Sequence, residues 1–134
     1  FEMYGVIAKA CGGRFVPVPL DDRYDIDDNA IIRADAENKP KFIFITYPNN
    51  PTGNCFTESR IKNILDNTGA LVVIDEAYYE FSQKTFLPLL KKYPNLIITR
   101  TFSKAYSMAG LRLGYMISSA AVCENVTKSG FRIT

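Results

Sequence analysis

Short runs of apolar residues recur along this chain, separated by polar stretches rich in turn-forming residues. Runs that are apolar at every position over four or five residues are typical of strands buried on both faces, as in a parallel sheet. They predict strands at 42–46 and 70–74, and further short apolar runs predict strands at 96–99 and 113–117. We expect a further strand at 15–18, towards an edge or an end of the sheet, because its proline cannot donate a ladder hydrogen bond.

Between the strands, apolar residues recur at the spacing of helices. This spacing predicts the end of a helix at 1–11, a helix at 57–67 capped by Thr57, and helices at 86–93 and 120–129, with a brief helical turn at 30–33. Strands that alternate with helices predict an α/β fold: a mostly parallel, doubly wound sheet with helices on both faces.

Composition narrows the class of protein. With 134 residues and 47% hydrophobic content, the chain suits one domain with a sizeable core. Its 16 basic and 14 acidic residues are interspersed and leave a net charge of +2, so we expect no nucleic-acid partner. No apolar run approaches the roughly 20 residues that span a bilayer, so we expect no membrane partner either.

The chain contains no histidine, which restricts its chemistry. Ser-His-Asp and Cys-His nucleophile systems, and metal sites with histidine ligands, cannot be built from this chain alone. The three cysteines are unclustered and odd in number, so neither a disulfide framework nor a metal site is indicated. Free thiols suit a reducing compartment, and we expect a cytoplasmic protein.

Three loops follow successive predicted strands, at 48–53, 75–79 and 101–104. In a parallel α/β sheet, ligands bind beyond the carboxyl ends of the strands. The three loops therefore meet at one rim, and their polar residues are the candidates for a binding or catalytic site.

Asp75 directly follows four apolar residues, so its carboxylate lies at a buried strand end and needs a partner. A protonated pyridine nitrogen, a helix cap or an ion pair with Arg100 would each serve. Tyr78 could direct its hydroxyl to the same rim or could simply pack. Asn49 and Asn50 suit the turn, one of them could be a ligand, and the bond from Asn50 to the following proline could be cis.

Lys104 is surrounded in sequence by hydroxyl residues that include Thr101 and Ser103, and Arg112 follows eight positions later. An amine among hydroxyls and a fixed cation suits a Schiff base with a phosphorylated aldehyde, because the hydroxyls and the cation can hold the phosphate. Taken singly, Lys104 is typical of a solvated surface charge, but its hydroxyl neighbours and the apolar residues Met108 and Leu111 favour a partly desolvated amine. Leucines flank Arg112, so we expect its head to be partly buried against a phosphate or an internal carboxylate.

Three motifs occur in order: YPNNPTG at 47–53, IDEAYYEF at 74–81 and RTFSKAYSMAGLRLGY at 100–115. Together they resemble the fold-type I aminotransferases that depend on pyridoxal 5′-phosphate (PLP), most closely the histidinol-phosphate aminotransferase branch. The resemblance runs from Phe1 almost to the end of the chain.

The resemblance implies a catalytic role for Lys104, which would carry PLP as a Schiff base and, once released, move the proton between Cα and C4′. Asp75 would keep the pyridine nitrogen protonated. Asn50 and Tyr78 would form hydrogen bonds with the 3-oxygen of the ring.

The resemblance also implies that Arg112, Thr101 and Ser103 bind the phosphate and that Phe1 stacks on the ring. Residues 1–134 would then be part of the PLP-binding large domain, without the segment before it and without the C-terminal small domain. On this reading the piece alone is inactive or nearly so, and the complete enzyme is a homodimer whose active site borrows residues from its partner.

The activity that the resemblance implies is amino transfer from histidinol phosphate to 2-oxoglutarate, in histidine biosynthesis. An aromatic amino acid aminotransferase and a PLP-dependent amino-acid phosphate decarboxylase share these motifs and remain alternatives. A PLP-fold regulator that binds a partner without catalysis is a third. The residues that bind the ring do not separate these possibilities, because the parts that bind the substrate lie outside the three motifs.

Overall fold

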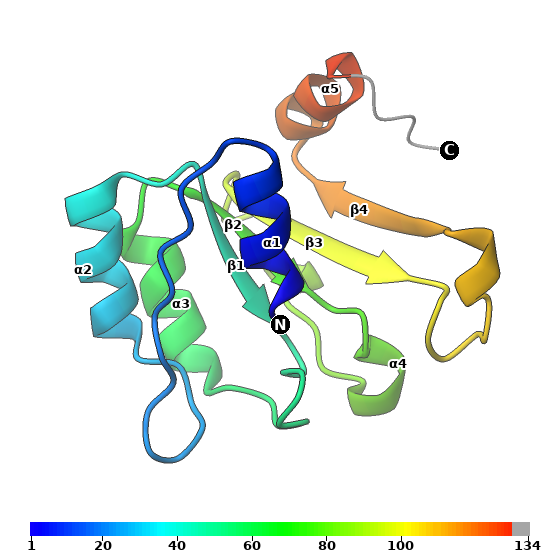
Figure 1. The fold of residues 1–134 in the computed structure, drawn as a ribbon, viewed down its shortest axis with the longest axis horizontal. Helices are drawn as coiled ribbons and strands as arrows, with labels where there is room; N and C mark the ends of the chain where they lie inside the picture. Colours follow the sequence, from blue (N-terminus) through cyan, green and yellow to red (C-terminus); the bar gives the residue numbers. More distant parts are fainter. Residues whose placement is uncertain (130–134) are drawn as a thin grey trace.

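A four-stranded sheet organises the structure, a computed structural model that describes residues 1–129 (Figure 1). The strands β1 (Phe42–Thr46), β2 (Leu71–Asp75), β3 (Leu96–Thr101) and β4 (Gly114–Ser118) lie in the order β1-β2-β3-β4. The first three are parallel, and β4 is antiparallel to β3. The expected α/β fold with a mostly parallel sheet is confirmed.

The carboxyl ends of the parallel strands form one row. Thr46 of β1 lies opposite Asp75 of β2, and Asp75 lies opposite Thr99 of β3. The loops that follow β1 and β2, and the turn that follows β3, therefore leave the sheet on the same side.

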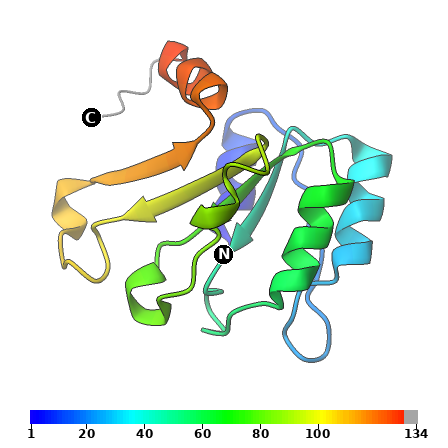
Figure 2. The same cartoon turned by 180° about the vertical axis from the view of Figure 1, so that it is seen from behind.

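Helices cover both faces of the sheet. Helix α1 (Met3–Ala10) lies over one face, and α2 (Asp28–Asn38) and α3 (Glu58–Asn67) lie on the other, as the view from behind shows (Figure 2). The remaining helices are α4 (Tyr79–Ser82), α5 (Ala120–Lys128) and the 3₁₀ turns Leu87–Leu89 and Ala109–Leu111. Within residues 1–129, none of the helices combines the length and apolar character that crossing a bilayer requires.

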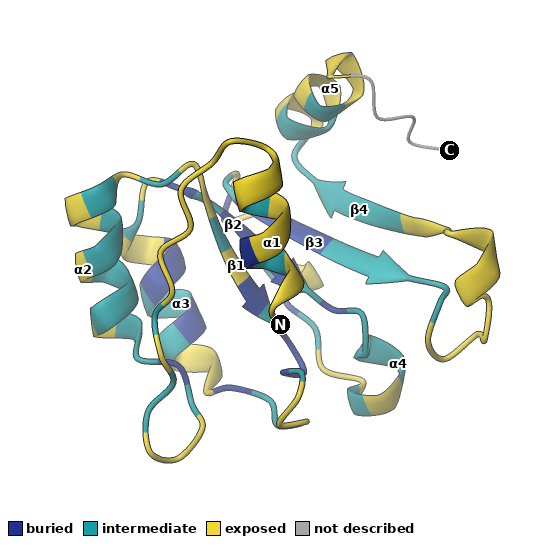
Figure 3. Ribbon diagram, viewed as in Figure 1, coloured by how far each residue is buried: buried dark blue, intermediate teal, exposed yellow. Residues whose placement is uncertain are grey.

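The core lies between the sheet and α3 (Figure 3). Ile61 and Ile64 of α3 are fully buried against Ile74 and Ile98, which lie on the same face of the central strands. Burying an isoleucine side chain stabilises a fold by about 1.5–3 kcal/mol, so these contacts fix α3 on the sheet. The position of α3 in turn fixes where the loop from β1 to α3 leaves the rim.

Two sequence predictions about strands are wrong. Residues 15–18 form no strand, and the only pairing near them is a bridge between Leu20 and Ile26. Strand β1 is not buried on both faces, since Phe42 and Phe44 are 48% and 49% exposed. Their rings face the side of α1, which covers only part of that surface.

The helix predictions also need correction. The brief turn expected at 30–33 is the eleven-residue helix α2, whose first turn is capped by Asp27 Oδ1 accepting from the Ala30 amide at 2.9 Å. Thr57 precedes α3 as expected, but its hydroxyl donates to Asp25 Oδ2 and does not cap the helix. The helix expected at 86–93 is only one 3₁₀ turn, Leu87–Leu89.

Candidate functional site

A small cavity of about 70 Å³ lies at the carboxyl ends of β1 and β2. Its lining comes from the residue two positions before α1, from the ends of both strands and from the three loops that the sequence singled out: Phe1, Thr46, Pro48, Asn50, Asp75, Ala77, Tyr78 and Lys104. Five of the eight predicted site residues therefore share one cavity: Phe1, Asn50, Asp75, Tyr78 and Lys104.

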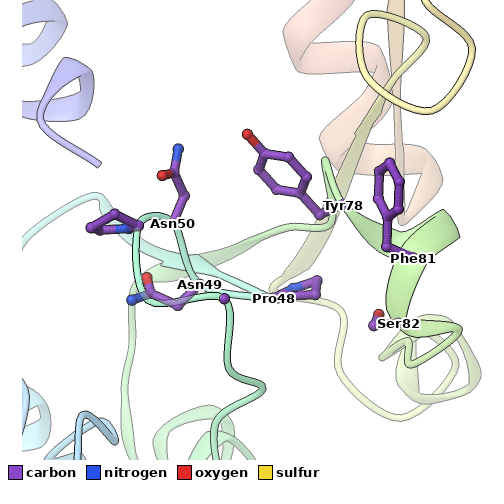
Figure 4. A pocket seen from close by; sticks show the side chains of 8 residues that line it. Pro48, Asn49, Asn50, Tyr78, Phe81 and Ser82 are labelled. Atoms are coloured by element: carbon purple, nitrogen blue, oxygen red, sulfur yellow. The ribbon is translucent and has the colours of Figure 1, made fainter.

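A larger hollow of about 410 Å³ adjoins this cavity and shares Pro48, Asn50 and Tyr78 with it. Asn50 and Tyr78 project to the same side from the loops after β1 and β2 (Figure 4). Phe81 and Ser82 of α4 line the hollow farther out. Asn50 and Tyr78 thus border both spaces, where a bound ring and a molecule that reacts with it could meet.

The two asparagines of the loop after β1 differ in role: one stabilises the turn and the other lines the cavity. The Asn49 amide N–H donates to Asn54 O, and its side-chain nitrogen donates to Thr52 Oγ1, so Asn49 holds the turn together. Asn50 lines the cavity. The peptide bond from Asn50 to Pro51 is cis, one of the two forms that the sequence left open, and the bond from Tyr47 to Pro48 is also cis.

Asp75 is placed by β2 and by two hydrogen bonds. Its Oδ1 accepts from the Ala77 amide at 3.0 Å, and its Oδ2 accepts from the Tyr4 hydroxyl. Within residues 1–129, no lysine or arginine forms an ion pair with it. The carboxylate is thus oriented at the rim and can accept from a cationic ligand.

The alternative ion pair between Asp75 and Arg100 does not form. Successive residues of a strand point to opposite faces, so Asp75 and its neighbour Glu76 face opposite ways. Arg100 pairs with Glu76 instead, at 2.8 Å between Nη2 and Oε2. This pairing on the far face leaves Asp75 to the cavity.

Glu76 and Arg100 form a buried polar cluster beneath the site. The Glu76 side chain is fully buried and accepts hydrogen bonds from the Phe86 amide and the Thr85 hydroxyl as well as from Arg100. The Arg100 guanidinium also stacks on Tyr79, 3.6 Å from the ring centroid. Burial, the largest single influence, lowers the pKa of Arg100, but the hydrogen bonds to Glu76 and Tyr115 and the charge of Glu76 together more than offset it, and the pKa is raised. The cluster ties the loop that carries Asp75 and Tyr78 to the strand that leads to Lys104.

Lys104 lies in the turn after β3, with its Nζ 5.5 Å from the centroid of the Tyr78 ring. It is exposed, so the structure agrees with the interpretation of Lys104 as a solvated charge, and the partial desolvation expected from its apolar sequence neighbours is wrong for this structure. The reason is that Met108 and Leu111 are themselves exposed and do not cover it. Lys104 nevertheless lines the cavity that also holds Asp75, and its Nζ lies near the ring of Tyr78, which lines the same cavity.

The three residues expected to bind a phosphate do not line the cavity. Thr101 Oγ1 accepts from the Ser103 amide at 3.1 Å, which shapes the start of the lysine turn. Arg112 is exposed and donates to Ala109 O at 3.2 Å, so its expected partial burial is wrong. The flanking Leu111 and Leu113 are also exposed, at 67% and 38%, and cannot bury it.

Sequence reasoning missed Tyr4, Thr46 and the Glu76–Arg100 pair. Tyr4 had a usable signal, because it lies three positions after Phe1 on a predicted helix and so faces the same way. Thr46 also had one, as the last residue of a strand that ends at the rim. The pairing of Arg100 needed the register of β2 and β3, which no local pattern contains.

Comparison with known proteins agrees with this geometry. The family model "Aminotransferase class I and II" matches residues 1–130. The histidinol-phosphate aminotransferase of Vesicomyosocius okutanii is 44% identical over 96% of this chain, and that of Caldanaerobacter subterraneus is 37% identical over 99%. The crystal structure of histidinol-phosphate aminotransferase from Sinorhizobium meliloti in complex with pyridoxal-5′-phosphate superposes with a TM-score of 0.84 at 29% identity, over 96% of this chain.

The chain spans 36% and 38% of the lengths of these two relatives and 36% of the chain in the crystal structure. The matched part contains the sheet, the three rim loops and the cavity at their junction. Because the family model covers nearly every residue of the sequence, the chain belongs to the class I and II aminotransferases.

Proposed function

We propose that this chain is part of the PLP-binding large domain of a longer aminotransferase, which moves an amino group from histidinol phosphate to 2-oxoglutarate. The observation that carries the proposal is one cavity that joins the amine of Lys104, the carboxylate of Asp75, and the side chains of Asn50 and Tyr78. Relatives 37% and 44% identical are histidinol-phosphate aminotransferases, which supports this amino donor over the alternatives.

The donor set suits PLP. The ring nitrogen of PLP stays protonated beside a carboxylate that is held in place and is not already paired with a cation. The Asp75 carboxylate is held by a hydrogen bond from the Ala77 amide, and among residues 1–129 it forms no ion pair with a lysine or an arginine. An aldehyde needs an amine, and Lys104 Nζ lies beside the same cavity. Asn50 and Tyr78 supply an amide and a phenol for the 3-oxygen, and Phe1 supplies an aromatic ring at the cavity wall.

Each residue then has a defined task. Asp75 would hold the ring nitrogen, Asn50 and Tyr78 would hold the 3-oxygen, and Lys104 would hold the cofactor through its amine. When bound, PLP supplies an electron sink for charge that develops at Cα of the amino donor. Lys104 Nζ, once freed by the incoming amine, would take up and return the proton at the reacting carbon.

The phosphate end of the site rests on the turn after β3. Ser103 and Thr101 contribute hydroxyl groups there, with the Ser103 amide donating to Thr101 Oγ1, and the Arg112 guanidinium is exposed, where an anion can reach it. We propose that these three residues bind the phosphate. An arginine fork matches phosphate oxygens, so its single bond to a carbonyl at 3.2 Å is a weak competitor.

We further propose a cytoplasmic homodimer with small-molecule amino and 2-oxo-acid substrates. Cys11, Cys55 and Cys123 are free thiols, which fits a reducing compartment. Large apolar residues of α1 and β1, among them Val6 and Phe44, are exposed and offer surface for other parts of the enzyme or for a partner subunit. Light scattering of the complete enzyme measures the oligomeric state.

A panel of amino donors tests the activity. The complete enzyme with PLP is given histidinol phosphate, phenylalanine or phosphothreonine, with 2-oxoglutarate as acceptor, and glutamate formation is followed. The proposal predicts the highest kcat/KM for histidinol phosphate. A preference for phenylalanine, release of carbon dioxide from phosphothreonine, or PLP binding without turnover of any donor would each reject it.

A further inference from the structure

Tyr4 is held over the sheet by aromatic contacts on two sides. Its ring stacks on Phe44 of β1, with centroids 4.9 Å apart and planes 25° apart. Phe1 meets it edge-on, with centroids 5.4 Å apart. These contacts hold the Tyr4 ring on the face of the sheet that α1 covers (Figure 1).

The Tyr4 hydroxyl donates a hydrogen bond to Asp75 Oδ2. Burial, and then the charge of Asp75, raise the pKa of Tyr4 well above its ordinary value, so the hydroxyl stays protonated and acts as a donor. The Ala77 amide donates to the other carboxylate oxygen. The carboxylate therefore has a fixed plane, set by one donor from α1 and one from the loop after β2.

We propose that Tyr4 is a positioning residue that fixes the orientation of the Asp75 carboxylate towards the ring nitrogen of PLP and stabilises its charge. The inference rests on the proposed function, because it assigns Tyr4 a task only if Asp75 binds that nitrogen. Tyr4 itself does not line the cavity. It acts through Asp75, whose oxygens each keep a lone pair after accepting one bond.

Two ligands separate this role from simple packing. PLP carries the ring nitrogen, and its 1-deaza analogue carries a carbon in that place with the aldehyde, 3-oxygen and phosphate unchanged. If Tyr4 acts through Asp75 on the nitrogen, Tyr4→Phe weakens the binding of PLP but not that of the analogue. If Tyr4 only packs α1 onto the sheet, the substitution affects both ligands alike or neither.

The experiment uses the complete enzyme without cofactor and measures the dissociation constants of PLP and 1-deaza-PLP. For Tyr4→Phe we expect about tenfold weaker PLP binding, equal to about 1.4 kcal/mol, and less than a twofold change for the analogue. The substitution removes one oxygen and leaves the contact with Phe44, so thermal unfolding should change little. Tyr79→Phe is the matched control, because Tyr79 is a half-buried tyrosine that faces Arg100 on the other side of the loop.

A double-mutant cycle gives a second readout. In an Asp75→Asn background, adding Tyr4→Phe should change PLP affinity less than twofold, because the carboxylate through which Tyr4 acts is gone. Equal losses for both ligands, or additive losses in the cycle, would overturn the role of Tyr4 and leave the proposed function intact. If the unsubstituted enzyme bound neither ligand, the proposed function itself would fail.

Discussion

We expect the buried Glu76–Arg100 pair to stabilise the loop that follows Asp75, and removing the charge of Arg100 tests this. Arg100→Met keeps most of the apolar volume of the side chain and removes its charge. Two donors to Glu76, Arg100 Nε at 3.0 Å and Nη2 at 2.8 Å, are lost. The Phe86 amide and the Thr85 hydroxyl remain.

The structure sets the size of the effect. The two side chains are 10% and 0% exposed, so solvent cannot compensate the charge that stays behind. Removing one partner of such a pair costs about 3–5 kcal/mol. Because two donors to Glu76 remain, we expect a loss at the lower end of this range: the loop between Glu76 and Phe86 should become less stable by about 3 kcal/mol.

Amide hydrogen exchange measures this loop directly, through the Phe86 N–H that bonds to Glu76 Oε1 at 2.8 Å. A loss of about 3 kcal/mol corresponds to roughly hundredfold faster exchange of that amide in the complete enzyme. Lys62→Met is the control: its pair with Glu58 has side chains 44% and 58% exposed and should contribute under about 0.5 kcal/mol. Less than threefold acceleration at Phe86 in Arg100→Met would refute the reasoning.

Two further predictions concern other parts of the fold. The hydrogen bond from Arg60, with smaller contributions from the backbone amides of Asp25 and Arg23, lowers the pKa of Asp21 from 3.8 to about 2. Asp21 therefore contributes stability above about pH 4 that is lost as the pH falls towards 2. In Arg60→Met, a carboxyl titration by NMR should show the pKa of Asp21 rise part of the way towards 3.8, and an unchanged value would contradict the role of Arg60. A Cβ on Gly114 would lie 2.8 Å from Arg100 O, so Gly114→Ala should destabilise the protein by about 1–3 kcal/mol in thermal unfolding. Gly110→Ala is the control and should leave the stability unchanged, because a Cβ there meets no atom within 4 Å. Equal melting temperatures for the two variants would argue against the close approach of β3 and β4.

The positions of the site residues follow largely from local pattern. Continuous apolar runs predicted β1, β2 and β3, and parallel strands necessarily present their carboxyl ends at one rim. This was enough to predict that the neighbourhoods of Asn50, Asp75 and Lys104 would meet, and the structure places all three in one cavity.

What sequence reasoning got wrong depends on contacts between distant parts of the chain. Burial of Arg112 was inferred from its two leucine neighbours, but neighbours bury a residue only where another element covers them. The proline-containing run at 15–18 has strand composition and no strand to pair with. Arg100 pairs with Glu76 and not with Asp75, because adjacent residues of an extended chain point to opposite faces of the sheet and only Glu76 faces Arg100.

The most direct test of the account is where PLP attaches. The complete enzyme is incubated with PLP, reduced with borohydride, digested and analysed by mass spectrometry, with Lys104→Ala and Lys84→Ala in parallel. The account predicts a pyridoxyl phosphate group on Lys104, retained in Lys84→Ala and absent from Lys104→Ala. Attachment to another lysine, or no attachment in a well-folded sample, would contradict it.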